Sequence, residues 1–207
     1  MRTILRGTET ETLELGGVLP ETARGLVPAP LAVRDGPLRV EVLLFAMHGL
    51  ALRAMPWPRF DYREALWRIE CERDGELGWY AIACDLDSAA IRVFGRRVVR
   101  YPTRTARFSG EWSIEAAGGT FTTRSAIDDR SEPPAPVAPR RMFVRDGELV
   151  FEIPWQEIPA PERHVARIEV LADSLSEPTF GHLVTWDSSG LVHRGRTHMC
   201  GRARRVD

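Results

Sequence analysis

Hydrophobic and polar residues alternate over long parts of the chain, which is the pattern of β-strands that bury one face. In residues 65–72 every second side chain is apolar, and most of those between are charged. Asp74-Gly75 then predicts a tight turn, and residues 79–86 read as the returning strand. The sequence therefore predicts a β-hairpin over residues 62–87, with its charged face toward solvent.

Further strands are predicted along most of the remaining chain. The runs that indicate them are apolar or alternating and are bounded by glycine, proline or Asp-Gly turns. They cover residues 39–45, 105–109, 111–116, 120–127, 142–145, 149–153 and 165–171. A last hairpin is expected over residues 183–199, with its turn near Ser189-Gly190.

A single helix is predicted after the first hairpin. Asp87 or Ser88 can accept hydrogen bonds from the amides of the first turn, as residues at this position commonly do. Apolar residues recur at helical spacing from Ala90 to Val98. Pro102 ends the helix, because proline disfavours helical geometry at the residue before it.

The number and order of these elements predict the fold class. A chain of 207 residues suits one domain. Residues 1–20 are polar and are expected to be mobile, and the proline-rich residues 129–140 predict a surface loop. Many strands around one short helix favour a closed or nearly closed barrel, because closure removes exposed strand edges. We therefore expect a single α+β, mainly β, domain over residues 1–207.

Composition excludes several classes of partner. The formal net charge is −1, which gives no general attraction for nucleic acid or for an anionic membrane. The most apolar stretch, residues 40–55, is interrupted by charges and is shorter than the roughly 20 residues of a spanning helix. There is no secretory signal pattern, and the three cysteines form no CxxC pair. We expect a cytoplasmic protein without disulfides.

Residues 95–104, Gly-Arg-Arg-Val-Val-Arg-Tyr-Pro-Thr-Arg, resemble the signature region of the acetoacetate decarboxylase superfamily. Supporting segments follow in the expected order: 26–30 before Asp35-Gly36, 79–87, 145–149 and Pro154-Trp155. The closer resemblance is to the uncharacterised bacterial branch of that superfamily, and it extends over residues 20–207. It implies a cone-shaped antiparallel β-barrel with an interior ligand pocket, and a tendency to form homo-oligomers.

The resemblance also identifies a missing group. In the decarboxylases the residue after the proline is the lysine that forms a Schiff base, and here that position is Thr103. The chain contains no lysine at all, and Arg104 and Arg97 occupy the neighbouring positions of the family pattern. A guanidinium stays protonated and cannot form the imine. The resemblance therefore implies the scaffold of a Schiff-base enzyme without its nucleophile.

Three residues near the helix exit are candidate ligand-binding groups. Arg97 and Arg104 could hold a carboxylate or another oxyanion if they point inward, with Thr103 beside them. The alternative is that they are exposed arginines of an arginine-rich protein. Tyr101 is a candidate catalytic residue, which either lines the pocket with its hydroxyl or packs beside Pro102.

Two carboxylates are the other candidate catalytic residues. Asp85 and Glu70 lie near the middle of paired strands and could act as general acid or base if they are buried in the barrel. Glu70, however, falls on the polar face of its strand, which is commonly exposed to solvent.

A metal site is not expected. His182, His193 and His198 lie near Asp187, but their spacing matches neither HExxH nor a zinc finger. If residues 191–198 form one strand, His193 and His198 lie on opposite faces, because they are five residues apart. The sequence contains no glycine-rich phosphate loop either, so we expect no cofactor.

These observations favour a lysine-independent enzyme that acts on a small organic carboxylate or carbonyl compound in the barrel interior. The alternative is a non-catalytic module that binds a hydrophobic metabolite, suggested by the absent lysine and the six tryptophans. A third possibility is a filled barrel that only assembles with partners. Convergent charged groups beside a cavity would favour the enzyme.

Overall fold

Fourteen β-strands and few short helices make up the computed structural model, which describes residues 5–52, 55–110, 112–128, 141–158, 160 and 162–206. The strands are β1 (Leu5–Leu19), β2 (Leu38–Leu52), β3 (Met55–Arg73), β4 (Glu76–Leu86), β5 (Thr103–Ser109), β6 (Ser113–Ala116), β7 (Gly119–Ile127), β8 (Arg141–Asp146), β9 (Leu149–Ile153), β10 (Trp155–Ile158), β11 (Glu162–Asp173), β12 (Thr185–Arg194), β13 (Arg196–Cys200) and β14 (Arg204–Val206). The helices are α1 (Ala89–Phe94), α2 (Ser176–Phe180), the 3₁₀ helix η1 (Glu21–Leu26) and the π-helix η2 (Gly95–Val99).

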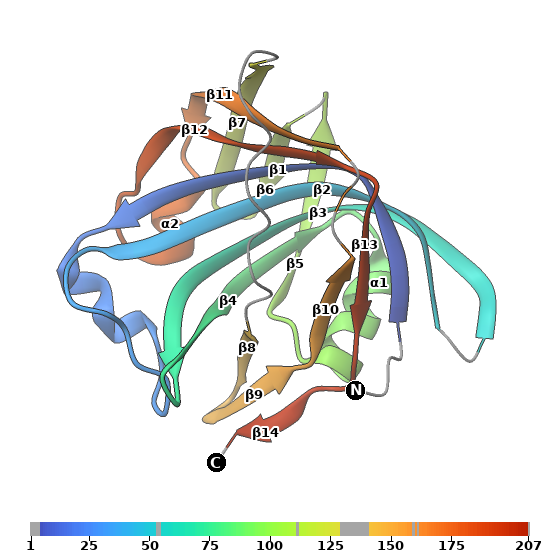
Figure 1. The fold of residues 1–207 in the computed structure, drawn as a ribbon, viewed down its shortest axis with the longest axis horizontal. Helices are drawn as coiled ribbons and strands as arrows, with labels where there is room; N and C mark the ends of the chain where they lie inside the picture. The colour runs from blue at the N-terminus through green and yellow to red at the C-terminus, as the bar shows by residue number, and fades with distance from the viewer. Residues whose placement is uncertain are drawn as a thin grey trace.

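The four long strands β1 to β4 form a sheet that is shared by two parts of the molecule, one on each of its faces. On one side they close a nine-strand barrel with β5, β6, β7, β11 and β12 (Figure 1). Neighbouring strands of this barrel run antiparallel except β4 and β5, which are parallel. We call this part the barrel lobe. It confirms the predicted fold class, a mainly β protein built on a barrel.

The same four strands carry a second layer on their other face. β13 pairs with the first half of β1, and β8 pairs in parallel with the first half of β4. β10 then extends from β13, while β9 and β14 extend from β8 (Figure 1). Together with α1 these strands form what we call the second lobe. Both faces of β1 to β4 are therefore covered by protein.

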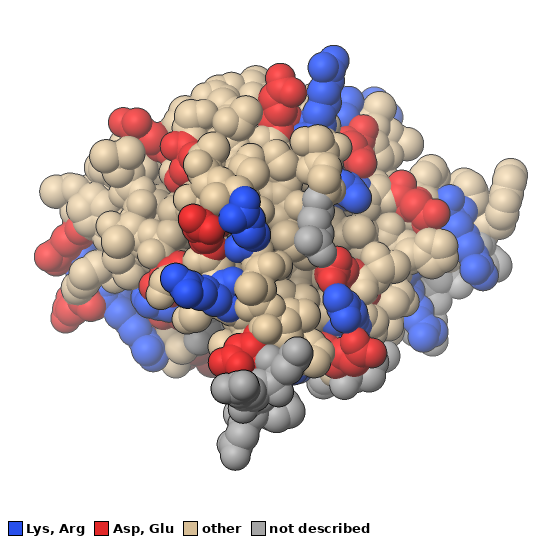
Figure 2. Space-filling view, turned by 90° about the horizontal axis from the view of Figure 1, so that it is seen from above, with Lys and Arg blue, Asp and Glu red and all other residues tan. Residues whose placement is uncertain are grey.

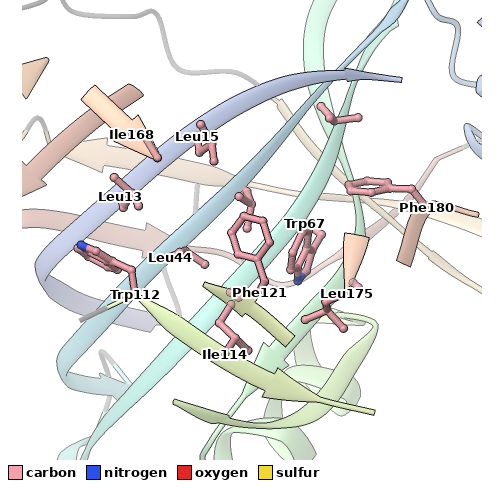
Figure 3. Packing of buried hydrophobic residues seen from close by; sticks show 14 of the residues in the cluster. Leu13, Leu15, Leu44, Trp67, Trp112, Ile114, Phe121, Ile168, Leu175 and Phe180 are labelled. Carbon is pink, nitrogen blue, oxygen red and sulfur yellow. The ribbon is translucent and has the colours of Figure 1, made fainter. Parts of the chain in front are cut away.

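Aromatic side chains fill the centre of the barrel lobe. The ring of Trp67 lies 5.3 Å from that of Phe121, 6.0 Å from Phe180 and 6.3 Å from Trp186. Trp67, Phe121 and Phe180 are completely buried, and leucine and isoleucine side chains surround them (Figure 3). A packed aromatic core thus occupies the barrel interior, where the family resemblance implies a ligand pocket.

The predicted helix begins where the sequence indicates but is short. Ser88 accepts a hydrogen bond from the amide of Ile91, which caps α1. The helix then widens into η2, which ends at Arg100 in the left-handed conformation. The first hairpin is also as predicted, with its turn at Asp74-Gly75. The predicted loop 129–140 lies outside the described residues.

Two predictions about strands are wrong. The polar N-terminal segment, expected to be mobile, contributes β1 over Leu5–Leu19, which pairs with three other strands. The expected turn at Ser189-Gly190 does not exist, because β12 runs straight through it. The chain bends instead at Gly195, whose φ of 76° separates β12 from β13.

Acidic and basic side chains are mixed on the face seen from above, where neither sign forms a continuous patch (Figure 2). Among the described residues, no helix is both long and apolar enough to cross a membrane.

Candidate functional site

Charged side chains are buried between β1, β2 and β3 and the second lobe. Glu9 is completely buried, and Glu64, Arg68, Arg196 and His198 are each at most 8% exposed. Glu9, Glu64 and Arg68 come from the long strands, on the face opposite the aromatic core, and Arg196 and His198 come from β13. Buried charges are costly unless they are paired, so their partners decide what this face can do.

Arg196 lies at the centre of this arrangement. Its Nε donates to Oε2 of Glu9 at 2.8 Å, and its Nη1 donates to Oε1 of Glu14 at 2.5 Å. Glu9 also accepts a hydrogen bond from the hydroxyl of Thr12. A second pair, Arg68 and Glu41, joins β3 to β2 with a separation of 2.7 Å.

His198 is held against Glu9 at the same place. Its Nε2 lies 2.6 Å from Oε1 of Glu9, while its ring stacks on Phe45 and meets Trp155 edge-on at 4.6 Å. The other ring nitrogen, Nδ1, is buried without a hydrogen-bond partner among the described residues, and Nε2, although close to Glu9, does not have hydrogen-bond geometry there. A histidine that is oriented by a carboxylate through one nitrogen has the other available to accept a proton.

The charges of this cluster keep two of its carboxylates ionised. Burial works to raise the pKa of Glu9, but the contact with His198, the charge of Arg196 and the hydrogen bonds outweigh it and hold the pKa at about 2. Burial likewise opposes ionisation of Glu14, and the hydrogen bond from His193 with the charge of Arg196 lowers its pKa below the ordinary value. Glu9 and Glu14 are therefore permanent anions at neutral pH.

Glu64 behaves in the opposite way. It is completely enclosed, its carboxyl accepts a hydrogen bond from the thiol of Cys84 at 3.1 Å, and it is hydrogen-bonded to Tyr62. Burial dominates and raises the pKa of Glu64 to about 8, and the nearby negative charge of Glu9 adds to the rise. At neutral pH this carboxyl carries its proton. It is thus a neutral acid beside a permanently charged carboxylate.

Tyr101 contributes a further hydroxyl to the same region. Its side chain packs against the core of the second lobe, and its hydroxyl is buried without a hydrogen-bond partner among the described residues. Burial, followed by the negative charge of Glu64, raises the pKa of Tyr101 well above the ordinary value for tyrosine. The hydroxyl therefore remains a donor over the whole physiological pH range.

An apolar cavity of about 220 Å³ lies between α1, the starts of β1 and β3 and the end of β2, and none of the charged groups above lines it. Leu5, Leu50, Phe60 and Ile91 form its walls, together with apolar residues around them. Phe60, Tyr62 and Glu64 lie on the same face of β3, because they are two residues apart. The strand therefore runs from the cavity at Phe60 toward the buried carboxyl of Glu64.

Register places the acid close to the histidine. Glu64 pairs directly with Phe45 across β2 and β3, and Phe45 is the residue on which His198 stacks. Glu64 also influences the pKa of Cys200, two residues after His198 on β13, although burial is the larger cause of that shift to about 12. His198, Glu64 and Tyr101 therefore face one enclosed region.

Thr103, at the position of the family's lysine, is fixed by its neighbours. It is 2% exposed, receives a hydrogen bond from Nε of Arg96 at 2.8 Å, and donates one to the carbonyl oxygen of Arg92 at 3.3 Å. Arg97 is exposed on η2. Of the three predicted ligand-binding residues, exposed Arg97 and buried Thr103 are therefore not brought together by the fold.

Asp85 and Arg104, predicted as acid and ligand-binding groups, pair with each other. Two nitrogens of Arg104 contact the two carboxylate oxygens of Asp85 at 2.8 and 2.7 Å, and the indole of Trp67 donates to Asp85 at 2.7 Å. Thr179 accepts from Arg104 at 3.1 Å. Asp85 points toward the aromatic core, so this pair closes the barrel lobe. Glu70 lies half-buried on β3, opposite Trp79.

His193 and His198 are both buried, although they lie on two different strands. The bend at Gly195 turns both side chains into the buried cluster, with Nε2 of His193 3.1 Å from Oε2 of Glu14. No group of three or more histidine, cysteine, aspartate or glutamate side chains in the described part of the chain is placed to hold a metal ion.

Sequence reasoning missed Glu9, Glu64, Arg196 and the role of His198. Alternation alone marks Glu64 as a member of the charged face of β3, which was expected to meet solvent. The neighbouring strand β2 carries the signal that this face is buried. Leu43, Phe45 and Met47 are apolar and lie on the same face of the sheet as Glu64. Apolar residues on both faces of a strand indicate that both are covered.

No protein-family model matches the chain, and no curated protein sequence matches it. Solved structures do match over its whole length. The enduracididine biosynthesis enzyme MppR, solved with pyruvate, is 13% identical and superposes with a TM-score of 0.71, covering 100% of this chain and 91% of the other. Acetoacetate decarboxylase from Legionella pneumophila is 13% identical with a TM-score of 0.69, covering 99% and 87%.

A third match is an acetoacetate decarboxylase-like enzyme from Sphingomonas wittichii RW1. It is 16% identical with a TM-score of 0.67, covering 100% of this chain and 94% of the other. Identities this low establish the fold and nothing more specific. The structural neighbours of the chain are acetoacetate decarboxylase and related enzymes, and the protein has their fold.

Proposed function

We propose that the protein is a lysine-independent enzyme that moves protons on a small carbonyl compound held inside the second lobe. The observation that carries this proposal is Glu64, a buried carboxyl whose pKa of about 8 keeps it protonated at neutral pH. An acid kept neutral by an enclosed site can donate to a carbonyl oxygen on which negative charge develops. Tyr62 and Tyr101 supply hydroxyls beside it.

His198 is the proposed base. Its Nδ1 accepts a proton from the carbon next to the carbonyl group, and the electrons of the broken C–H bond form the carbon–carbon double bond of an enol. The carbonyl oxygen takes the proton of Glu64 at the same time. The reverse transfers restore the carbonyl, with the proton on the same or a different carbon. Glu9 holds the ring through Nε2 and stabilises the imidazolium that forms.

This chemistry does not need an imine. Thr103 stands where the decarboxylases carry their lysine, and the chain offers no lysine elsewhere. Stabilising an enolate by fixed hydrogen-bond donors replaces covalent activation of the carbonyl. The proposal thus accounts for an enzyme-like fold in which the usual nucleophile is absent.

Solvent exchange tests the proposal. In D₂O the protein is expected to exchange the α-protons of methyl ketones, measured by proton NMR, and His198→Gln or Glu64→Gln is expected to slow exchange about 100-fold or more. The wild-type rate should fall as the pH rises through about 8, because Glu64 then loses the proton it donates.

Matched controls separate chemistry from damage to the fold. His48→Gln and Glu115→Gln change exposed residues of the same types and should leave the rate unchanged. Exchange that persists in both site variants would remove His198 and Glu64 from the mechanism.

The second candidate function is a module that binds a hydrophobic metabolite without turnover. It is favoured by the cavity beside α1, whose walls carry no charged residue. Binding of an apolar ligand without any α-proton exchange, across a panel of ketones and keto acids, would select it.

A further inference from the structure

The cavity beside α1 has the walls of a binding site for a hydrocarbon group. All nine of its lining residues are apolar, including Leu5, Leu50, Phe60, Ile91 and Phe94. Its volume of about 220 Å³ exceeds the roughly 150 Å³ that accommodates benzene in an engineered protein cavity. It has room for a phenyl ring or a short branched chain.

Two strands, β1 and β3, run from this cavity toward the proton-transfer groups. Each step of two residues along β3 covers about 6.6 Å, so Tyr62 and Glu64 follow Phe60 at increasing distance from the cavity. β1 repeats the order, with Leu5 at the cavity and Glu9 deeper in the lobe. A molecule with one apolar and one polar end would lie with its polar end toward Glu64.

We propose that the substrates are carbonyl compounds bearing an aryl group, or an alkyl chain of about four to eight carbons, and that this group occupies the cavity beside α1. The inference rests on the proposed function and adds the class of molecule. A charged or strongly hydrated tail is excluded, because no wall residue of the cavity could replace its lost hydration.

Binding of toluene tests the cavity without any chemistry. Ala90 lines it from the exposed side of α1, so Ala90→Phe should fill the space without disturbing the core. The neighbouring Ala89 is also exposed but is not part of the cavity wall, which makes Ala89→Phe the matched control. We expect toluene to bind the wild type and Ala89→Phe equally, with at least tenfold weaker binding to Ala90→Phe. Equal binding to all three would overturn the inference.

A series of methyl ketones tests the substrate class. From butan-2-one to heptan-2-one, the exchange rate per unit concentration should rise about fourfold for each added methylene that the cavity buries. 4-Phenylbutan-2-one should exchange faster than butan-2-one, and Ala90→Phe should abolish both trends. Rates that are independent of tail length in the wild type would contradict the inference even if exchange occurs.

The two proposals can fail separately. If toluene distinguishes Ala90→Phe from Ala89→Phe but no ketone exchanges, the cavity is a ligand site and the proton-transfer function is wrong. If ketones exchange in a manner sensitive to Glu64 but toluene binds all variants alike, the function stands and the assigned substrate class is wrong.

Discussion

Replacing Arg196 with methionine is expected to lower the free energy of unfolding by about 3–5 kcal/mol at neutral pH. The variant leaves Glu9, which is completely buried, without its main guanidinium partner, and it removes the hydrogen bond to Glu14 as well. Methionine keeps much of the volume, so the loss reports uncompensated buried charge more than a cavity. Urea denaturation followed by circular dichroism measures it.

The loss should also depend on pH. The pKa of Glu9 is depressed in the folded protein, so its ionised form stabilises the fold above its ordinary value of 4.5, and this contribution is lost as the pH falls through about 2. The difference between wild type and Arg196→Met should therefore narrow below about pH 4.5.

Arg194 provides the matched control, two residues earlier. Arg194 is the last residue of β12 and pairs with Glu11, with its own side chain 48% accessible. Arg194→Met should cost less than about 1 kcal/mol. If the two variants destabilise equally, the cluster around Arg196 is not the buried ionic centre described above.

Arg104→Met is expected to destabilise the protein by about 3 kcal/mol or more. The carboxylate of Asp85 is completely buried and accepts three described hydrogen bonds, two from Arg104 and one from the indole of Trp67. The variant removes the two from Arg104. The hydrogen bond that links β5 to Thr179 is lost too. Thermal unfolding and urea titration measure the change.

The same strand supplies the comparison. Arg107 is exposed on β5, and Arg107→Met should change stability by no more than about 0.5 kcal/mol. An Arg104→Met variant as stable as Arg107→Met would show that the Asp85 pair does not hold the barrel lobe together.

The fold could be predicted from the sequence where local patterns were sufficient. Asp74-Gly75 specified the first hairpin, and Ser88 marked the start of α1, because turns and caps depend on residues close in sequence. The N-terminal strand was missed since its polar residues, such as Glu9 and Thr12, are paired with partners nearly two hundred residues away.

The last part of the chain shows why a glycine can be misread. Ser189-Gly190 resembles a turn, but Gly190 lies inside β12. Glycine is needed there because a Cβ atom would lie 2.2 Å from the carbonyl oxygen of Glu14 and 2.3 Å from the side chain of Ile168. Gly195, which is less conspicuous in sequence, makes the actual bend with its positive φ. Such close approaches depend on neighbouring strands and are invisible in one sequence.

The site was harder to predict than the fold for a related reason. Charged residues on one face of β3 were expected to meet solvent, and nothing local reveals that β13 and α1 cover that face. Asp85 was considered as an acid or base on the condition that it is buried; it is buried, but its charge is satisfied by Arg104 and Trp67, so burial does not indicate reactivity. Glu64 has no cationic partner among its described contacts, and its burial raises its pKa.

The proposed proton transfer requires that Glu64 carry a proton at neutral pH, and titration of its carboxyl measures this. Carbon-13 NMR of protein labelled at the glutamate side-chain carboxyl, with Glu64→Gln used to assign the signal, would follow its ionisation from pH 4 to 10. We expect a midpoint of about 8, so that the carboxyl carries a proton at neutral pH and can donate it. A midpoint near the ordinary value of 4.5 would rule out Glu64 as the acid, because the carboxylate would then be ionised at neutral pH.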